Sequence, residues 1–182
     1  MRPASAAVPP SVHGGSAAGT ATALAARKPA SGARPNFVWR VRVYYEDTDS
    51  GGVVYYANYL RFFERCRTEW MRALGFGQRD LAERDGILFV VAAAEVQYLR
   101  SAVLDDELVI DARIAERHAS YAVFEQQALR GSELLCRARV KVACIGAQTM
   151  RPTRLPSALA AALASAAQDP AVAGGAATGE PS

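Results

Sequence analysis

Histidine is nearly absent from this sequence, which removes the side chain that acid–base catalysis uses most often. The 182 residues include two histidines, His13 in a low-complexity leader and His118 in an expected hairpin turn. A histidine-dependent catalytic triad is therefore nearly excluded. The sequence also contains no GxSxG elbow, no GxxxxGK(S/T) phosphate loop, no GxGxxG fingerprint and no HExxH zinc motif. Hydrolytic or acid–base chemistry must then rest on carboxylates.

Cysteine is also scarce. Cys66, Cys136 and Cys144 form no CxxC pair and are odd in number, so we expect neither a disulfide framework nor a bound metal. Cys66 lies on an apolar helical stripe, and the other two share one parity of a predicted strand. We therefore expect buried and unreactive thiols.

Long apolar runs are missing as well. No stretch approaches the roughly 18 apolar residues of a membrane span, and the N-terminal segment lacks the apolar core of a secretory signal. These absences predict a cytoplasmic protein with no membrane span. The net charge is +3, but no basic patch lies on a recognisable motif, so we expect no nucleic-acid partner.

The composition divides the chain into three parts. Residues 1–35 are mostly Ala, Pro, Ser, Gly and Thr, and we expect a poorly ordered leader there. This acid-free segment is equally compatible with a transit peptide or with a start codon assigned too early. Residues 36–156 have the patterning of one globular domain, and residues 157–182 form an Ala-rich tail that we expect to be partly helical or disordered.

Inside the domain, apolar periodicity predicts one strand, one long helix and four further strands. The first strand covers Phe37–Glu46, and the helix covers about Tyr56 to Leu74, with Gly75 as its stop. A short polar helix is expected over Gln78–Asp85. The remaining strands are Ile87–Arg100, Glu107–Arg117, Ser120–Arg130 and Glu133–Ile145. This order predicts an α+β fold in which a five-stranded, largely antiparallel sheet packs its apolar face on the long helix.

An acidic turn between the first strand and the long helix is the strongest candidate for a site. In YYEDTDSGGVVYYANY, Asp47 and Asp49 are followed by Gly51 and Gly52, and the helix begins immediately afterwards. Such an order places a carboxylate beside the unpaired amides of a helix N-terminus. A plain turn before a helix has the same composition, but the surrounding tyrosines favour a site.

The D-x-D spacing also begins an EF-hand calcium loop, but the residues at the later ligand positions do not match such a loop. A loop that starts at Asp47 has Gly51 at its fifth position, where an oxygen ligand is usual. It has Asn58 rather than Glu at its twelfth position.

Two other residues are candidates for the same site. Tyr45 precedes Asp47 by two residues, and we expect its ring to face a pocket. Glu64 lies just over two helical turns past Tyr56, off the aromatic stripe. It either faces the site across a subunit boundary or pairs with Arg61, Arg67 or Thr68.

The segment VRVYYEDTDSGGVVYYANYLRFFERCRTEWMRALG resembles the hotdog-fold acyl-CoA thioesterases of the 4-hydroxybenzoyl-CoA thioesterase family. Within that family it is most similar to the branch associated with the Tol-Pal system. The likeness continues more weakly through FVVAAAEVQYLRSAVLDDELVI to RPTRLP, and so covers about Phe37 to Pro156.

The resemblance implies a hotdog fold, with homodimers or homotetramers whose active sites lie at subunit interfaces. It implies that Asp49 is the catalytic carboxylate, as nucleophile or general base, and that Asp47 is structural. The main-chain amide of Tyr56 is then the leading oxyanion donor, and Tyr45 matches a tyrosine of the family's active site. Some members have histidine where this chain has Tyr56, and tyrosine, with an ordinary pKa of about 10, is no base near neutral pH.

The resemblance further implies an acyl-CoA substrate and no separate cofactor, because CoA is part of the substrate. Acyl carrier protein is a second possible carrier of the acyl group. A non-catalytic scaffold that binds acyl-CoA or acyl carrier protein is the alternative function. A hotdog hydratase is weaker, since such enzymes generally use an Asp–His pair. The acyl chain length and the contacts to the CoA phosphates stay open.

Overall fold

The computed structural model describes residues 36–168 and 172–173. The expectation for the leader, residues 1–35, lies outside these ranges, as does the one for most of the last fourteen residues.

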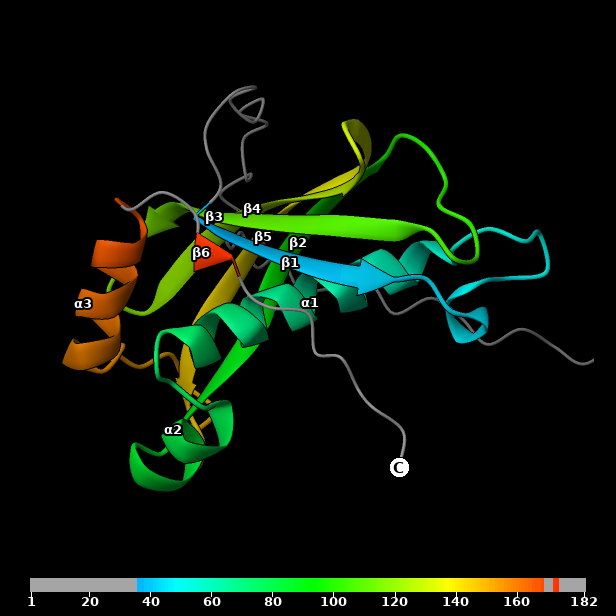
Figure 1. Cartoon of the computed structure of the whole chain (residues 1–182). Coiled ribbons are helices and arrows are strands. Elements are labelled where there is room, and N and C mark those ends of the chain that lie inside the picture. Colours follow the sequence, from blue (N-terminus) through cyan, green and yellow to red (C-terminus); the bar gives the residue numbers. More distant parts are fainter. Residues whose placement is uncertain (1–35, 169–171, 174–182) are drawn as a thin grey trace, which may run out of the picture. The chain divides into compact units, whose positions relative to one another are not determined.

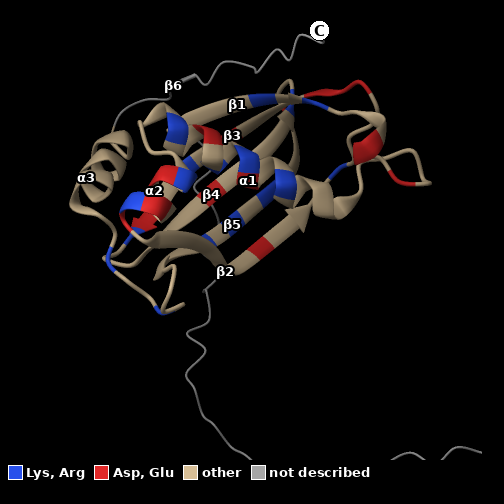
Figure 2. Cartoon of the chain, turned by 90° about the horizontal axis from the view of Figure 1, so that it is seen from below, with Lys and Arg blue, Asp and Glu red and all other residues tan. Residues whose placement is uncertain are grey.

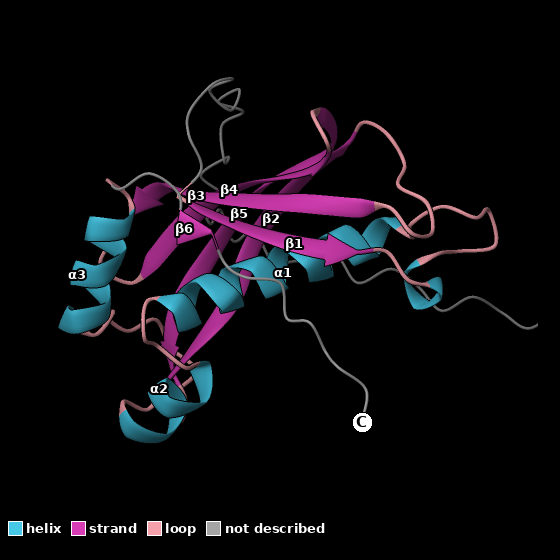
Figure 3. Ribbon diagram, viewed as in Figure 1, coloured by secondary structure: helices cyan, strands magenta, loops and turns pink. Residues whose placement is uncertain are grey.

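The described residues form one sheet with a long helix across one of its faces (Figures 1 and 3). The strands are β1 (Phe37–Arg42), β2 (Ile87–Tyr98), β3 (Glu107–Arg117), β4 (Tyr121–Arg130), β5 (Glu133–Gly146) and β6 (Val172–Ala173). Their order is β2-β5-β4-β3-β1-β6, and all neighbours are antiparallel except β1 and β6. The predicted five-stranded antiparallel sheet is confirmed, and β6 is an addition that the sequence did not indicate.

Helix α1 (Tyr56–Ala73) packs its aromatic stripe on the sheet, as its periodicity predicts. Phe62, Phe63 and Cys66 are completely buried, and the Trp70 ring stacks on Phe37 of β1 with their centroids 5.9 Å apart. The helix ends before Gly75, whose φ of +87° is the left-handed conformation expected of a glycine stop.

A second, smaller core lies beyond the C-terminal end of α1. Helices α2 (Gln78–Arg84) and α3 (Ser157–Ala166) pack there against the ends of β2 and β5. Its buried members are Leu81, Ile87, Cys144, Leu159 and Leu163. Helix α3 is the expected helical part of the tail. Its buried leucines pack on the domain, so the packed part of the chain extends beyond Pro156, the domain end expected from the sequence.

The first strand is shorter than predicted. The expected strand Phe37–Glu46 stops at Arg42, and Tyr45–Asp47 form a single 3-10 turn, η1. The alternation of apolar residues continues through Tyr45, but the Asp47 carboxylate accepts a hydrogen bond from the Tyr44 amide at 3.0 Å and bends the backbone. The expectation of a strand through Glu46 was therefore wrong.

All three cysteines are buried, as expected. Burial raises the pKa of the Cys66 and Cys136 thiols to about 12, so neither is a thiolate near neutral pH. Within residues 36–168 and 172–173, none of the helices has both the length and the apolar character required to cross a membrane.

Figure 2, seen from the side of α1, shows acidic and basic residues interspersed along the elements. On the sheet face opposite α1 many of these charges are paired. Arg139 of β5 donates to Glu125 at 2.9 Å and also pairs with Glu116, while Arg113 pairs with Glu125. The Arg139 and Glu125 side chains are only 12% and 10% exposed, so part of this face is a buried ion-pair network.

Asp111 on this face generates a pH-dependent prediction. Burial raises its pKa from 3.8 to about 6, against smaller opposing effects of a hydrogen bond with the Gln127 backbone and of the Arg113 charge. Because the folded state holds the proton more tightly, stability falls as the pH rises from about 4 to about 6. We expect Asp111→Asn to be more stable than wild type above pH 7, by up to about 3 kcal/mol, and equal to it near pH 4.

Urea denaturation at pH 4, 6 and 8 measures this difference, with Glu95→Gln as an exposed control on β2. A constant difference at all three pH values would show that Asp111 does not titrate in this range.

Candidate functional site

The acidic turn is organised around Asp47, which is buried. Its backbone carbonyl accepts hydrogen bonds from the Tyr55 amide and from the Asn58 side chain, both at 2.9 Å. Its carboxylate accepts the Tyr44 amide. Asp47 therefore ties the end of the 3-10 turn to the start of α1, and this geometry gives it a structural role.

Asp49 has the opposite environment, because its side chain is exposed. Its Oδ1 accepts the Gly51 amide at 2.8 Å, and within the described residues no hydrogen bond reaches Oδ2. Its amide donates to the Val53 carbonyl at 2.9 Å, and its carbonyl accepts the Gly52 amide at 3.0 Å. The carboxylate is thus fixed in direction by the backbone and keeps one oxygen available for chemistry.

The two glycines are required by this turn for different reasons. Gly52 has φ of +73°, which a residue with a side chain rarely adopts. At Gly51, a Cβ atom would lie 3.0 Å from the Oδ1 of Asp49. A side chain at residue 51 would therefore press on the carboxylate that the turn presents.

Helix α1 begins just after this turn with its first amides uncapped. Tyr55 precedes the helix, and no side chain in the part of the chain that the structure describes caps it by a hydrogen bond. The Asn58 amide already donates to the Tyr55 carbonyl, whereas the Tyr56 and Ala57 amides precede any intrahelical acceptor. Asp49 pairs with Val53, three residues before Tyr56, so a carboxylate and free helix amides lie at the same end of the molecule.

Tyrosine rings lie around the start of α1. The Tyr55 and Tyr56 rings are 4.6 Å apart, and Tyr98, at the end of β2, lies 6.0 Å from Tyr56 and 5.9 Å from Tyr59. The hydrogen bond with Tyr56 raises the pKa of Tyr55, and the nearby charges of Tyr56 and Asp49 raise it further. Tyr55, Tyr56 and Tyr98 are all exposed, and such a patch is typical of a surface that binds something.

Sequence reasoning overlooked Tyr98. Its position at the end of a strand carries no signal of its own, and only the fold brings it to the first turn of α1.

Among the residues that the structure describes, Tyr45 does not face a pocket. Its side chain is 81% exposed, and its contacts to the turn are made by its carbonyl, which accepts both the amide and the hydroxyl of Thr48. The described residues of one chain therefore do not form the expected pocket around Tyr45.

Glu64 lies apart from Asp49. It is eight residues beyond Tyr56, or about 12 Å along α1 at 1.5 Å per residue, and it accepts the Thr68 hydroxyl at 2.7 Å. Of the two alternatives, pairing with Thr68 is the one seen in this chain. Glu64 also lies at a cavity of about 100 Å³ between α1, the sheet and α3, which is lined mainly by apolar side chains.

Within the described part of the chain, Asp49 has no histidine partner and belongs to no cluster of metal-binding side chains. His118 lies in the turn between β3 and β4, stacked on Tyr121 at 4.2 Å. Among the described residues, no three His, Cys, Asp or Glu side chains come together as a metal site requires. The chemistry that the geometry supports is attack assisted by a carboxylate, with helix amides receiving the negative charge.

Comparisons with known proteins show the family of this chain. Residues 43–163 match the family model of the thioesterase-like superfamily. The acyl-CoA thioesterase YbgC of Haemophilus influenzae is 45% identical over 126 residues, which are 69% of this chain and 93% of that protein. The acyl-CoA thioester hydrolase YbgC of Escherichia coli O6:H1 is 45% identical over 127 residues, again 69% and 93% of the two chains.

The crystal structure of a probable thioesterase from Bartonella henselae superposes with a TM-score of 0.63 at 40% identity. The match covers 65% of this chain and 98% of that one. The hotdog fold that the sequence motif implied is thereby confirmed.

The different environments of the two aspartates predict different effects on stability. Asp47→Ala removes a buried acceptor from the Tyr44 amide, and we expect a loss of about 1–3 kcal/mol in the free energy of unfolding. Asp49→Asn changes an exposed group, and we expect a change within about 0.5 kcal/mol. Urea denaturation of both variants measures these values, and equal losses would contradict the division of roles.

Proposed function

Because this chain belongs to the thioesterase-like superfamily, we propose that it hydrolyses the thioester of an acyl-CoA to a free acid and CoA, with Asp49 as the catalytic carboxylate. The observation that supports this most directly is the exposed Asp49 carboxylate, oriented by Gly51, in the turn that leads into the uncapped start of α1. The enzyme is thus a thioester hydrolase whose chemistry needs no histidine and no cofactor beyond the CoA of its substrate.

In the general-base route, Asp49 takes a proton from water while the water oxygen bonds to the thioester carbonyl carbon. The carbonyl becomes an oxyanion, the C–S bond then breaks, and the CoA thiolate leaves and takes up the proton from Asp49, with the acid as the other product. In the nucleophilic route, an Asp49 oxygen attacks the carbon itself and expels the thiolate, and water hydrolyses the resulting anhydride. Both routes need one unbonded carboxylate oxygen, which Asp49 has.

The Tyr56 amide, at the positive end of the α1 dipole, is the proposed oxyanion donor. A main-chain donor does not depend on the side chain of the residue that carries it. For this reason the presence of tyrosine rather than histidine at residue 56 leaves the oxyanion site intact. The Tyr56 ring is 59% exposed and packs on Tyr55 and Tyr98, where it is suited to contact the substrate or a second subunit.

We further propose that the enzyme is a homodimer or homotetramer in which a second copy completes the site. Three exposed tyrosines surround the start of α1, and β2 ends the sheet with one edge unpaired within the described residues. A second copy on this side would enclose the carboxylate and separate the site from bulk solvent, with room left for the reacting water. It would also allow Tyr45 of one subunit and Glu64 of the other to belong to the same site. Acyl carrier protein as a partner and a cytoplasmic location stay predictions.

The proposed activity predicts release of free thiol from acyl-CoA. We expect turnover of at least one member of a panel of short-chain, long-chain and aromatic acyl-CoAs, followed with a thiol-reactive dye. Asp49→Asn should lower kcat by at least about 10²-fold, because it removes the base or nucleophile, while the oligomer stays intact by size-exclusion chromatography.

Saturable binding of acyl-CoA by folded protein, without any hydrolysis, would instead support the non-catalytic scaffold. Full activity of Asp49→Asn would remove this residue from the mechanism.

Gly51 offers an independent test of the carboxylate's orientation. Gly51→Ala places a methyl group against the Asp49 Oδ1, and we expect kcat to fall by about 10-fold or more with a small change in stability. Ser50→Ala is the matched control at the neighbouring exposed residue and should keep wild-type kcat. Equal kcat values in the two variants would show that the orientation set by the turn does not matter.

A further inference from the structure

A second loop contacts the acidic turn. This loop, residues 99–106, connects β2 to β3. Val103 forms an antiparallel bridge with Val53, and the Ala102 carbonyl accepts the Val54 amide at 2.9 Å. The Ala102 amide donates to the Tyr59 hydroxyl on α1 at 3.0 Å. The loop therefore contacts both the segment that carries Asp49 and the first turns of the helix.

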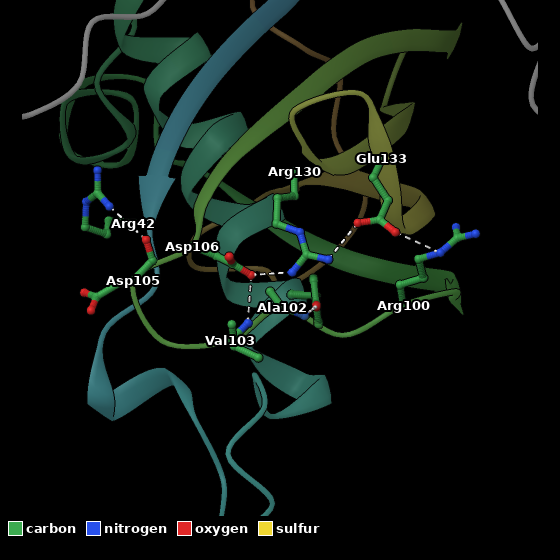
Figure 4. A network of polar contacts seen from close by, with 9 residues as sticks. Arg42, Arg100, Ala102, Val103, Asp105, Asp106, Arg130 and Glu133 are labelled. Carbon is green, nitrogen blue, oxygen red and sulfur yellow. Dashed lines mark hydrogen bonds and ion pairs between the residues drawn. The ribbon is translucent and has the colours of Figure 1, made fainter.

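Asp106 holds this loop in shape, as Figure 4 shows. Its Oδ2 accepts the Val103 amide at 2.9 Å and the Arg130 guanidinium at 2.7 Å. Its own amide donates to the Val103 carbonyl at 3.2 Å, and its carbonyl accepts the Val43 amide at 2.9 Å. The side chain is only 17% exposed, so these bonds are partly shielded from water.

Arg130 connects the loop to the β4–β5 hairpin. It is the last residue of β4, and its second guanidinium nitrogen donates to Glu133 at 2.7 Å. Glu133 in turn pairs with Arg100 at 2.9 Å (Figure 4). A planar guanidinium that donates to two carboxylates has a fixed direction, which an ammonium group cannot reproduce.

We propose that Asp106 and Arg130 are positioning residues of the thioesterase site: they fix the 99–106 loop, and this loop fixes the Asp49 turn against the start of α1. The inference rests on the proposed function. The bonded path runs from Arg130 to Asp106, to Val103, across the bridge to Val53, and then to the Asp49 amide. Neither Asp106 nor Arg130 has to touch the substrate, since both act through the backbone that aims the carboxylate.

The physical reason for a kinetic effect is the geometric demand of the reaction. A shift of about 1 Å in a reacting group can cost about 10²-fold in rate without weakening substrate binding in proportion. When Asp106 is lost, the Val103 amide loses its side-chain acceptor and Arg130 loses its bond to the loop. The Asp49 turn then keeps its own hydrogen bonds, but the 99–106 loop that contacts it is less rigid.

The test compares Asp106→Ala with Glu133→Gln. The control variant removes the negative charge of the other carboxylate that binds the same guanidinium. Glu133 pairs with the loop at Arg100, at its start, and not at Val103, which forms the bridge to the Asp49 segment. We expect Asp106→Ala to lower kcat by about 10- to 100-fold with KM within about threefold, and Glu133→Gln to keep kcat within about twofold. Asp106→Asn keeps an acceptor for the Val103 amide and should recover part of the loss.

A double-variant comparison shows whether the two residues act as a unit. If Asp106 acts through Arg130, the Asp106→Ala, Arg130→Gln double variant should lose no more kcat than the stronger of the two single variants. Losses that multiply would overturn the paired role. If Asp106→Ala does not fold, Asp106→Asn and Arg130→Gln replace it in the same comparison.

Hydrogen exchange provides a readout that does not depend on activity. In folded Asp106→Ala, the amides of Asp49 and Val54 should exchange faster than in wild type, whereas those of β3 and β4 should be unchanged. Wild-type kcat together with wild-type exchange in this variant would overturn the inference. If the wild-type protein hydrolyses no acyl-CoA at all, the proposed function fails, and the exchange of Asp49 and Val54 still decides whether Asp106 positions the turn.

Discussion

The packing of the aromatic stripe of α1 on the sheet is the interaction on which the rest of the structure depends. Phe62, Phe63, Cys66 and Trp70 are buried there, and each large apolar side chain contributes about 1.5–3 kcal/mol when it leaves water. Polar connections also hold the helix on the sheet: Gln126 of β4 is completely buried, donates to the Phe63 carbonyl at 3.0 Å and accepts from Arg67 at 2.6 Å. With the helix fixed, its first amides and the preceding turn also have fixed positions. The proposed oxyanion site is thus a consequence of core packing about two turns away.

Two aspartates two residues apart have different environments because the fold buries only one of them. Asp47 is buried and its polar groups bind Tyr44, Tyr55 and Asn58, so its side chain is committed to structure. Asp49 faces solvent with one oxygen held and the other free. A third carboxylate, that of Asp106, also has a structural role. It binds the Val103 amide of the 99–106 loop, and Val103 forms a bridge with Val53 in the segment that carries Asp49.

Elements with strong periodicity were predictable to within a few residues. The limits of α1, β3 and β5 differ from expectation by at most one residue, because apolar spacing and glycine stops act locally. The end of β1 was not predictable in this way, since Val43 pairs with Asp105 and Asp106, far along the chain. The environment of Arg139 was not predictable from its own strand either, because its partners Glu116 and Glu125 come from two other strands. The burial of α3 was likewise hidden, because an Ala- and Leu-rich segment has no polar face to reveal its orientation.

The sequence by itself determined the α+β order, the position of the long helix and the acidic turn with its two glycines, because these depend on side-chain period and on local backbone preference. It also indicated Asp49 through a motif, without showing what surrounds that residue. Only the tertiary structure decided that Asp47 is buried and Asp49 exposed, that Tyr98 joins the tyrosines of α1, and that Tyr45 and Glu64 lie outside a shared pocket. Only the fold places Asp106 and Arg130 next to each other, at the loop that forms a bridge with the acidic turn. These relations join segments distant in the sequence, and their contacts follow from strand order and packing rather than from any local pattern.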